Sequence, residues 1–284
     1  MAQQLAVFGS PIGHSKSPVL HRTAYDLLGL DWDYTSREVT APELPSIVAT
    51  MDASWRGLSL TMPLKGVAFE LAGTRDAMAE LTGAVNTLRF VPDRGLFGYN
   101  TDVAGITRAL AAVGMTHAPH VHILGGGATA ASAVVAAAEL GALSVSVLAR
   151  TPEKSAALVD LGRRAGLTVS LSTFDDLSQL PEPQLVVSTL PGGSAVPVTY
   201  SPAVRASTAL LDVAYDPWPS SLAGTWTDAG GRVANGLSML AHQALVQVRI
   251  FADNDPFAPV DNEAEVLAAM LASVGLDARG LPVV

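Results

Sequence analysis

The sequence predicts an α/β protein with two domains, the second of them a doubly wound parallel sheet. The chain has 284 residues, which is comfortable for two domains. Hydrophobic residues make up 49% of it and charged residues only 15%, so the chain can bury a large core. Short apolar runs with strand character alternate with helical patterns along most of its length, as is typical of α/β folds.

The first domain is expected to contain three strands, three helices and a hairpin. Ser17 as N-cap and Pro18 at the first helical position indicate where the first helix begins. Pro92-Asp93-Arg94-Gly95 is a hairpin signal between two apolar runs. The pattern predicts strands at 5–8, 32–37, 57–61, 85–91 and 96–99, and helices at 17–28, 42–50 and 65–72.

The second domain is expected to repeat a strand–helix–strand rhythm after Asp102. An amphipathic helix at 103–113 leads into the first strand, and a glycine turn at 125–127 follows that strand. The pattern predicts strands at 120–124, 144–148, 168–172, 185–190 and 210–214, and helices at 128–140, 153–165, 238–251 and 263–274.

Composition excludes several classes of function. The formal net charge of −9 opposes a broad phosphate-binding surface, so nucleic acid is not an expected partner. The chain has no cysteine, hence no disulfide or thiolate site. The first residues lack the features of a signal peptide, and no apolar run reads as a membrane span, so a cytoplasmic protein is expected. No carboxylate cluster accompanies His117, His120 and His122, and we expect no metal.

A glycine-rich turn joins the first strand of the second domain to a helix of small residues. The segment Val121-His-Ile-Leu-Gly125-Gly-Gly127-Ala-Thr-Ala130 fits the pattern G-x-G-x-x-A. In this pattern the glycines permit a tight turn and close approach of a pyrophosphate, and the helix N-terminus supplies N–H groups to the anion. The turn therefore favours a dinucleotide site, the alternative being a tight turn without a ligand.

The end of the next strand indicates which dinucleotide binds. NAD sites usually have an acidic residue there, whereas this chain has Ala149-Arg150-Thr151, with Lys154 following. Arg150 can hold a 2′-phosphate by charge-assisted hydrogen bonds. Against the alternative of a solvated basic pair at a helix start, the position of Arg150 predicts NADP.

Four short motifs in the first domain combine neutral hydrogen-bonding groups with a few charged ones, among them Lys65 and Asp102. Each could serve as turn chemistry or as a helix cap. Together they suit a polyhydroxylated ligand with one acidic group. The motifs are His14-Ser15-Lys16-Ser17-Pro18, Thr61-Met-Pro63-Leu-Lys65, Gly83-Ala-Val-Asn86-Thr87 and Gly98-Tyr-Asn100-Thr101-Asp102.

The ordered set of motifs resembles the shikimate dehydrogenase family. The match also includes A-R-T, D-V-A-Y-D-P and M-L-A-H-Q-A, and it runs from Val7 to about Phe251. The resemblance implies a substrate-binding catalytic domain at 1–102, a Rossmann-type NADP domain at 103–237, and C-terminal helices at 238–284 that return to the first domain. It implies the NADP-linked interconversion of shikimate and 3-dehydroshikimate in aromatic amino acid biosynthesis.

The resemblance also implies roles for individual residues. Lys65 and Asp102 would be the catalytic pair, with Lys65 moving the proton. Ser15 and Ser17 would bind the substrate carboxylate, and Tyr215 would lie near it and the nicotinamide. The ring hydroxyls would be held by Thr61, Asn86, Asp102 and Gln243. The NADP site would comprise Gly125, Gly126, Gly127, Ala128, Thr129, Ala130, Arg150, Thr151, Lys154, Thr189 and Gly236.

At three positions the chain departs from the family pattern. Ser59 stands where the family usually has asparagine, and it is a shorter hydrogen-bonding arm. Ala149 replaces the usual asparagine before Arg150, and Ala128 replaces one glycine of the frequent G-x-G-G turn. None of the three changes removes a catalytic group, and Ser59 bears most on substrate contacts.

Two other functions fit the same motifs. A quinate/shikimate dehydrogenase that uses NAD is one, and the lack of an acidic residue at position 150 argues against NAD. A catalytically silent sensor of the same ligands is the other, and the intact pair Lys65 and Asp102 argues against it. In each case the partner is a small molecule, and the chain is expected to be a monomer or a homodimer.

Overall fold

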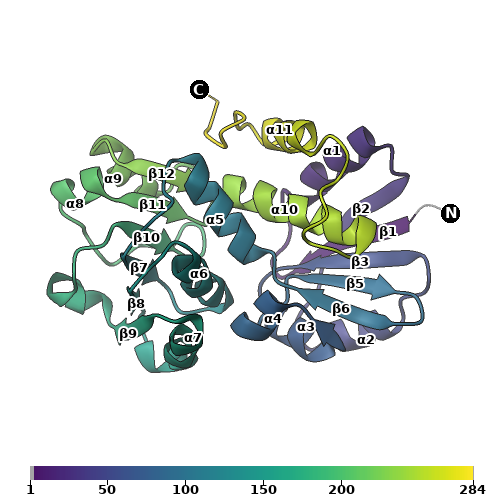
Figure 1. Ribbon diagram of the computed structural model, residues 1–284, viewed down its shortest axis with the longest axis horizontal. Helices are drawn as coiled ribbons and strands as arrows, with labels where there is room; N and C mark the ends of the chain where they lie inside the picture. Colours follow the sequence, from purple (N-terminus) through teal and green to yellow (C-terminus); the bar gives the residue numbers. More distant parts are fainter. Residues whose placement is uncertain (1–2, 284) are drawn as a thin grey trace. The chain divides into compact units, whose positions relative to one another are not determined.

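The computed structural model describes residues 3–283 and divides them into two compact units (Figure 1). The first unit runs up to Asp102 and also includes Leu240–Ala278 and the residues from Pro282 onward. The second unit contains Val103–Met239 and Arg279–Leu281. Each unit is built around one six-stranded sheet. Val284, the last residue of the predicted C-terminal segment, lies outside the described residues.

The sheet of the first unit is mixed. Its strand order is β2-β1-β3-β5-β6-β4, with β1 parallel to β2 and β3, and with β3, β5 and β6 antiparallel in turn. The predicted hairpin is confirmed, because Val91 pairs with Gly95 across the turn. The strands are β1 (Gln3–Gly9), β2 (Trp32–Glu38), β3 (Trp55–Leu60), β4 (Thr74–Arg75), β5 (Thr87–Val91) and β6 (Gly95–Tyr99).

Helices of the first unit pack on this sheet and against each other (Figure 1). A Cβ at Gly57 of β3 would lie 2.5 Å from the ring of Phe251, so the glycine lets the long helix α10 approach the sheet closely. The helices are α1 (Ser17–Leu28), α2 (Leu44–Ala49), α3 (Lys65–Leu71), α4 (Ala77–Thr82), α11 (Glu263–Ser273) and the part of α10 (Gly236–Asp253) from Leu240 onward.

The start of α1 differs from the prediction. Ser17 is not the N-cap: the cap position is Lys16, which makes no side-chain capping bond. The Ser17 side chain is buried on the inner face of the helix, and a buried inward-facing hydroxyl cannot turn back to the helix end. The hydroxyl of Ser15 instead accepts a hydrogen bond of 3.3 Å from the backbone N–H of Ser17.

The sheet of the second unit is entirely parallel, with the order β12-β11-β10-β7-β8-β9. The chain builds outward from β7 in one direction and then returns to build on its other side, so the predicted doubly wound fold is confirmed. The strands are β7 (His120–Leu124), β8 (Ser144–Leu148), β9 (Thr168–Ser172), β10 (Leu185–Ser188), β11 (Ala209–Asp212) and β12 (Arg232–Asn235).

Some short elements of the two units were not predicted, and one predicted helix proves to be two elements. The expected helix at 153–165 is a 3-10 turn, η1 (Pro152–Ser155), followed by α7 (Ala157–Ala165). Six short elements had no prediction: β4, α4, β12, α8 (Pro202–Ser207), α9 (Ser221–Asp228) and η2 (Phe174–Gln179). The remaining helices are α5 (Asp102–Ala112) and α6 (Ala128–Glu139).

Within residues 3–283, no helix combines the length and the apolar character needed to cross a membrane.

Candidate active site

Lys65 and Asp102 meet in the first unit, although they are far apart in the sequence. Lys65 is the first residue of α3, and Asp102 is the first residue of α5, directly after β6. The Nζ of Lys65 lies 2.5 Å from Oδ2 of Asp102. The two side chains are only 11% and 6% exposed. The pair is therefore a nearly buried, hydrogen-bonded ion pair, which is costly to form unless its geometry is held by neighbours.

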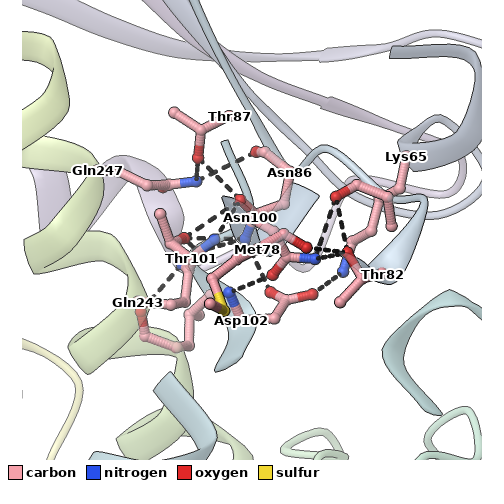
Figure 2. A network of polar contacts seen from close by, with 12 residues as sticks. Lys65, Met78, Thr82, Asn86, Thr87, Asn100, Thr101, Asp102, Gln243 and Gln247 are labelled. Carbon is pink, nitrogen blue, oxygen red and sulfur yellow. Dashed lines mark hydrogen bonds and ion pairs between the residues drawn. The ribbon is translucent and has the colours of Figure 1, made fainter. Parts of the chain in front are cut away.

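Neighbouring side chains hold Asp102 in place (Figure 2). The amide nitrogen of Asn86 donates to Oδ1 of Asp102 at 2.8 Å. The backbone N–H of Asp102 donates to Oδ1 of Asn100 at 3.0 Å. Asn100 therefore satisfies the N–H at the start of α5, and the two carboxylate oxygens of Asp102 remain for Lys65 and Asn86. Asp102 is therefore the first residue of α5 and not the plain N-cap that was the alternative for it.

Helix α10 adds Gln243 to the same network (Figure 2). Its Oε1 lies 3.0 Å from the hydroxyl of Thr101 and 3.3 Å from the amide nitrogen of Asn86. Gln243 and Asn86 are both buried, at 5% and 2% exposed. The structure thus joins four of the predicted site residues, Lys65, Asn86, Asp102 and Gln243, in one connected set of polar groups.

Three further predicted residues belong to the first unit but stay outside that network. Thr61 follows β3 and is half-buried, Ser15 is half-buried in the loop before α1, and Ser17 is buried at 4% exposed. Among the described residues, no hydrogen bond joins these hydroxyls to Lys65 or Asp102. The substrate-binding roles of these three hydroxyls stay predictions.

Sequence reasoning missed three residues of the network. Thr101 and Asn100 stand in the motif that supplied Asp102, and their spacing was the available signal. Gln247 lies one helical turn after Gln243, so both face the same side of α10. Its amide contacts Asn86 and Thr87 at 3.2 and 2.9 Å.

The glycine turn of the second unit is closely packed on one side and open on the other. Gly125 has a φ of +101°, and a Cβ there would lie 2.7 Å from the hydroxyl of Thr189. A Cβ on Gly126 would lie 1.8 Å from the hydroxyl of Ser155, which no side chain tolerates without a shift. Gly127, the N-cap of α6, has nothing within 4 Å of its Cβ position. The turn therefore leaves backbone exposed at the start of α6, where N–H groups favour an anion.

The basic residues predicted to select NADP follow the next strand, β8. Arg150 and Lys154 are exposed, and Thr151 is half-buried. Ala149, in place of the asparagine of the family pattern, is buried at 8% exposed. The structure therefore places two exposed cations and a hydroxyl after β8, with Ala149 turned into the core.

The other residues predicted for the second unit occupy its strand ends and helix starts. Thr189 follows β10 and donates from its hydroxyl to the carbonyl of Leu124 at 2.9 Å. A Cβ on Gly236 would lie 2.1 Å from the carbonyl oxygen of Val213. Tyr215 is half-buried, and burial together with the nearby Asp216 raises its pKa. Ala128, Thr129 and Ala130 form the first turn of α6.

Two histidines of the second unit, His120 and His122, have ordinary partners. His120 contacts the hydroxyl of Ser144 at 2.8 Å. His122 contacts the hydroxyl of Tyr200 and the carbonyl of Pro181, and burial lowers its pKa to about 4. In the part of the chain that the structure describes, no three His, Cys, Asp or Glu residues form a group able to hold a metal.

Known proteins similar to this chain include shikimate dehydrogenases from several organisms. Residues 7–88 match the family model of the shikimate dehydrogenase substrate binding domain. The shikimate dehydrogenase (NADP(+)) of Methanothermobacter thermautotrophicus is 32% identical over 93% of this chain and 95% of its own length. The crystal structure of Mycobacterium tuberculosis shikimate dehydrogenase is 41% identical, with a TM-score of 0.82 over 95% of this chain and 99% of that one.

One solved relative was crystallised with both ligands. The shikimate 5-dehydrogenase of Thermus thermophilus, in complex with NADP(H) and shikimate, is 29% identical to this chain with a TM-score of 0.80. The match covers 95% of this chain and 99% of that one. The likeness therefore extends over both units and is not confined to the glycine turn.

Proposed function

This chain belongs to the shikimate dehydrogenase family, and we propose that Lys65 and Asp102 form the catalytic pair of its reaction. The enzyme is an NADP-dependent oxidoreductase that interconverts shikimate and 3-dehydroshikimate. The observation that supports our proposal is the nearly buried contact of 2.5 Å between Lys65 and Asp102, held by Asn86. An intact pair of this kind would be lost in a sensor without activity.

The second unit fits NADP. The space that side chains at Gly125 and Gly126 would fill is taken by Thr189 and Ser155, so the turn keeps its backbone bare at the start of α6. Gly125, Gly126 and Gly127 would hold the pyrophosphate there, and the exposed Arg150 with Thr151 and Lys154 would hold the 2′-phosphate. When bound, NADP supplies the redox chemistry by accepting or donating the hydride.

Oxidation of the shikimate alcohol also releases a proton, which a protein group must accept. The neutral amine form of Lys65 is the candidate base for this proton, and in the reverse direction the ammonium form, which pairs with Asp102, returns it. Asp102 Oδ2 faces Nζ and holds it in position by an ion pair of 2.5 Å. Oδ1 of Asp102 is fixed by Asn86, so the carboxylate is oriented before the substrate arrives.

Neutral groups of the first unit would bind the rest of the substrate. Asn86 and Gln243 offer amides, and Thr61 offers a hydroxyl, to the ring hydroxyls. Ser15 and Ser17 would donate to the carboxylate, since hydrogen bonds to an ionised acceptor are stronger than neutral ones. Tyr215, in the second unit, would contact the substrate when both ligands are bound.

Single-turnover measurements on a Lys65→Met variant test the proton-transfer role. The variant keeps a side chain of similar length but no base, so the rate should fall by about 10²–10⁴-fold. Shikimate should still bind in a direct titration. A single-turnover rate equal to that of the wild type would refute the role of Lys65, and a complete loss of binding would show that Lys65 acts in recognition instead.

We further propose that the enzyme acts in the cytoplasm, as a monomer or a homodimer, without a nucleic-acid partner. The absence of cysteine and the net charge of −9 support this view. Light scattering of the purified chain would measure its mass directly. A larger assembly, or retention on a DNA column at physiological salt, would contradict the proposal.

A further inference from the structure

A tyrosine hydroxyl in the first unit is buried without a hydrogen-bond partner. Tyr34 on β2 is 0% exposed. Its hydroxyl oxygen makes no hydrogen bond in the part of the chain that the structure describes. Burying a hydroxyl without a partner costs free energy, because its bonds to water are lost and not replaced. A group kept in this state has either a packing role that phenylalanine would serve better or a partner that it engages under other conditions.

Two serine hydroxyls lie beside this group. Burial raises the pKa of Tyr34, and the nearby hydroxyls of Ser59 and Ser17 oppose that effect as hydrogen-bonding groups. Neither lies in the geometry of a regular hydrogen bond to Tyr34. The position of Ser17 has an independent reason. It stands one helical turn before His21 on the buried face of α1, and the ring of His21 stacks on that of Tyr34 with centroids 4.0 Å apart.

The register of the sheet explains the position of Ser59. Leu5 of β1 pairs with Tyr34 of β2 on one side and with Gly57 of β3 on the other. Ser59 lies two residues after Gly57, so its side chain and that of Tyr34 point to the same face of the sheet. Both are buried there.

Gln247 fixes the direction in which Ser59 donates. Its Nε2 lies 3.2 Å from the carbonyl oxygen of Asn86 (Figure 2). A carbonyl oxygen can only accept, so this end of the amide carries the hydrogens and the other end is the oxygen. Oε1 of Gln247 lies 2.8 Å from the hydroxyl of Ser59. Ser59 therefore donates its only proton to Gln247 and can only accept from Tyr34.

The hydrogen-bond partners of His21, the histidine beside Tyr34, also fix which of its ring nitrogens carries the hydrogen. His21 Nε2 lies 3.1 Å from the same Oε1 of Gln247, so this nitrogen carries the hydrogen. Burial lowers the pKa of His21 to about 3, against the bond to Gln247, so the ring is neutral. Its Nδ1 then accepts from the hydroxyl of Tyr25 at 3.0 Å. Neither His21 nor Tyr25 has a proton left for Tyr34.

Ser17 is the remaining neighbour with which Tyr34 can exchange a hydrogen bond. The hydroxyl proton of Ser17 can point in two directions. If Tyr34 donates to Ser59, the oxygen of Tyr34 is free to accept, and Ser17 can turn its proton inward. If Tyr34 donates to Ser17, the proton of Ser17 is left for an acceptor outside. An ionised carboxylate favours the second arrangement, because it is the stronger acceptor and neighbouring hydrogen bonds reinforce one another.

We propose that Tyr34 is a positioning residue for substrate recognition: it donates to Ser17 and so directs the Ser17 proton toward the substrate carboxylate. The proposal rests on the proposed role of Ser17. Because Tyr34 is closed to solvent, it acts through Ser17 and does not itself touch the substrate.

A Tyr34→Phe variant tests the proposal, with Tyr25→Phe as the matched control. Tyr34→Phe should raise the dissociation constant for shikimate about three- to tenfold, the value of one hydrogen bond. Its turnover number and NADP affinity should stay unchanged, and its thermal midpoint should not fall, since the deleted hydroxyl has no partner. Tyr25→Phe should do the opposite: it leaves Nδ1 of His21 unpaired, so the midpoint falls while shikimate affinity is kept.

The double variant with Ser17→Ala separates this proposal from the assigned role of Ser17. We call the donation from Tyr34 to Ser17 and from Ser17 to the carboxylate the relay. If both single variants weaken shikimate binding and Tyr34→Phe adds nothing to Ser17→Ala, the relay is supported. If only Ser17→Ala weakens binding, or if the two effects add, the relay is wrong and the carboxylate role of Ser17 stands. If Ser17→Ala leaves binding unchanged, the role of Ser17 and the relay are both refuted, whatever Tyr34→Phe does.

Discussion

The predicted ligand sites of the two units are built from different kinds of groups. In the first, side chains from distant segments are buried and already bonded to each other, as with Lys65, Asp102 and Asn86. In the second, the predicted NADP site consists of bare backbone at Gly125–Gly127 and of exposed side chains such as Arg150. A site of paired buried groups fixes geometry before the ligand arrives, whereas a site of backbone and surface charge mainly supplies shape and attraction.

This difference matches the chemistry of each site. Proton transfer requires groups held close to the productive geometry, and a connected network provides that. Holding a phosphate requires positive potential and room, which a glycine turn and solvated cations supply at little cost in stability. We therefore expect substitutions at the first site to lower the turnover number strongly. Substitutions at the second site should weaken cofactor binding more moderately.

Asp102→Asn should produce the largest effect. The amide keeps the size of the carboxylate but removes the charge opposite Lys65, so the turnover number should fall by at least about 10²-fold. NADP affinity, measured by fluorescence titration, should be unchanged because Asp102 belongs to the first unit. A loss of NADP affinity as large as the loss of turnover would contradict the assignment of catalysis to the first unit and cofactor binding to the second.

Gly126→Ala should damage the glycine turn by a steric clash. Its Cβ would lie 1.8 Å from the hydroxyl of Ser155, and such overpacking costs about 1–3 kcal/mol. We expect a lower thermal midpoint and a higher Michaelis constant for NADP. Gly127→Ala is the matched control, since nothing lies within 4 Å of its Cβ. If a Gly126→Ala/Ser155→Gly double variant regains the wild-type midpoint and Michaelis constant, the clash with Ser155 is supported as the cause. Equal values for Gly126→Ala and Gly127→Ala would refute it.

Arg150→Ala should act on cofactor choice alone. Loss of one charge-assisted hydrogen bond should weaken NADP binding about tenfold and leave NAD binding nearly unchanged. The effect should shrink at high salt, because Arg150 is exposed. Arg163→Ala removes a comparably exposed arginine from α7 and serves as the control. Equal losses for NADP and NAD would mean that Arg150 does not recognise the 2′-phosphate.

Asp76 offers a smaller, pH-dependent test within the first unit. It accepts the backbone N–H of Asn100, the residue that caps α5 beside Asp102. Burial raises its pKa to about 6, against the backbone N–H bonds from Ala79 and Asn100. The folded state therefore binds the proton more tightly than the unfolded state. The stability that this proton contributes is fully present below about pH 4 and is lost as the pH rises through 6.

Asp76→Asn keeps an N-cap for α4 but cannot titrate. Relative to this variant, the wild type should gain about 1–3 kcal/mol of unfolding free energy as the pH falls from 7 to 4. Urea denaturation at both pH values measures the difference. Asp160→Asn, at an exposed surface carboxylate, is the control. A constant difference between wild type and Asp76→Asn would contradict the shifted pKa.

Local sequence signals predicted most elements longer than one turn, because apolar period and turn residues act over a few positions. They placed α6 and β8 to within one residue. They failed where local rules compete with burial. Ser17 has the sequence of an N-cap but is turned inward on α1, and the helix expected at 153–165 is interrupted before Ala157. The mixed pairing in the first sheet also had no local signal, since strand order depends on contacts between distant segments.

The sequence by itself determined the doubly wound sheet, the glycine turn with Arg150 after the next strand, and the residue types that can handle a proton and hold a hydroxylated acid. Those properties depend on composition and short spacing. Only the tertiary structure decided which groups meet. Asn86 contacts Asp102 because both lie at the ends of strands of the first sheet. Gln247 fixes the proton of Ser59 because α10 packs on that sheet, which brings together residues 188 positions apart. The unpaired hydroxyl of Tyr34 likewise follows from packing, since burial and hydrogen bonding are properties of the folded chain.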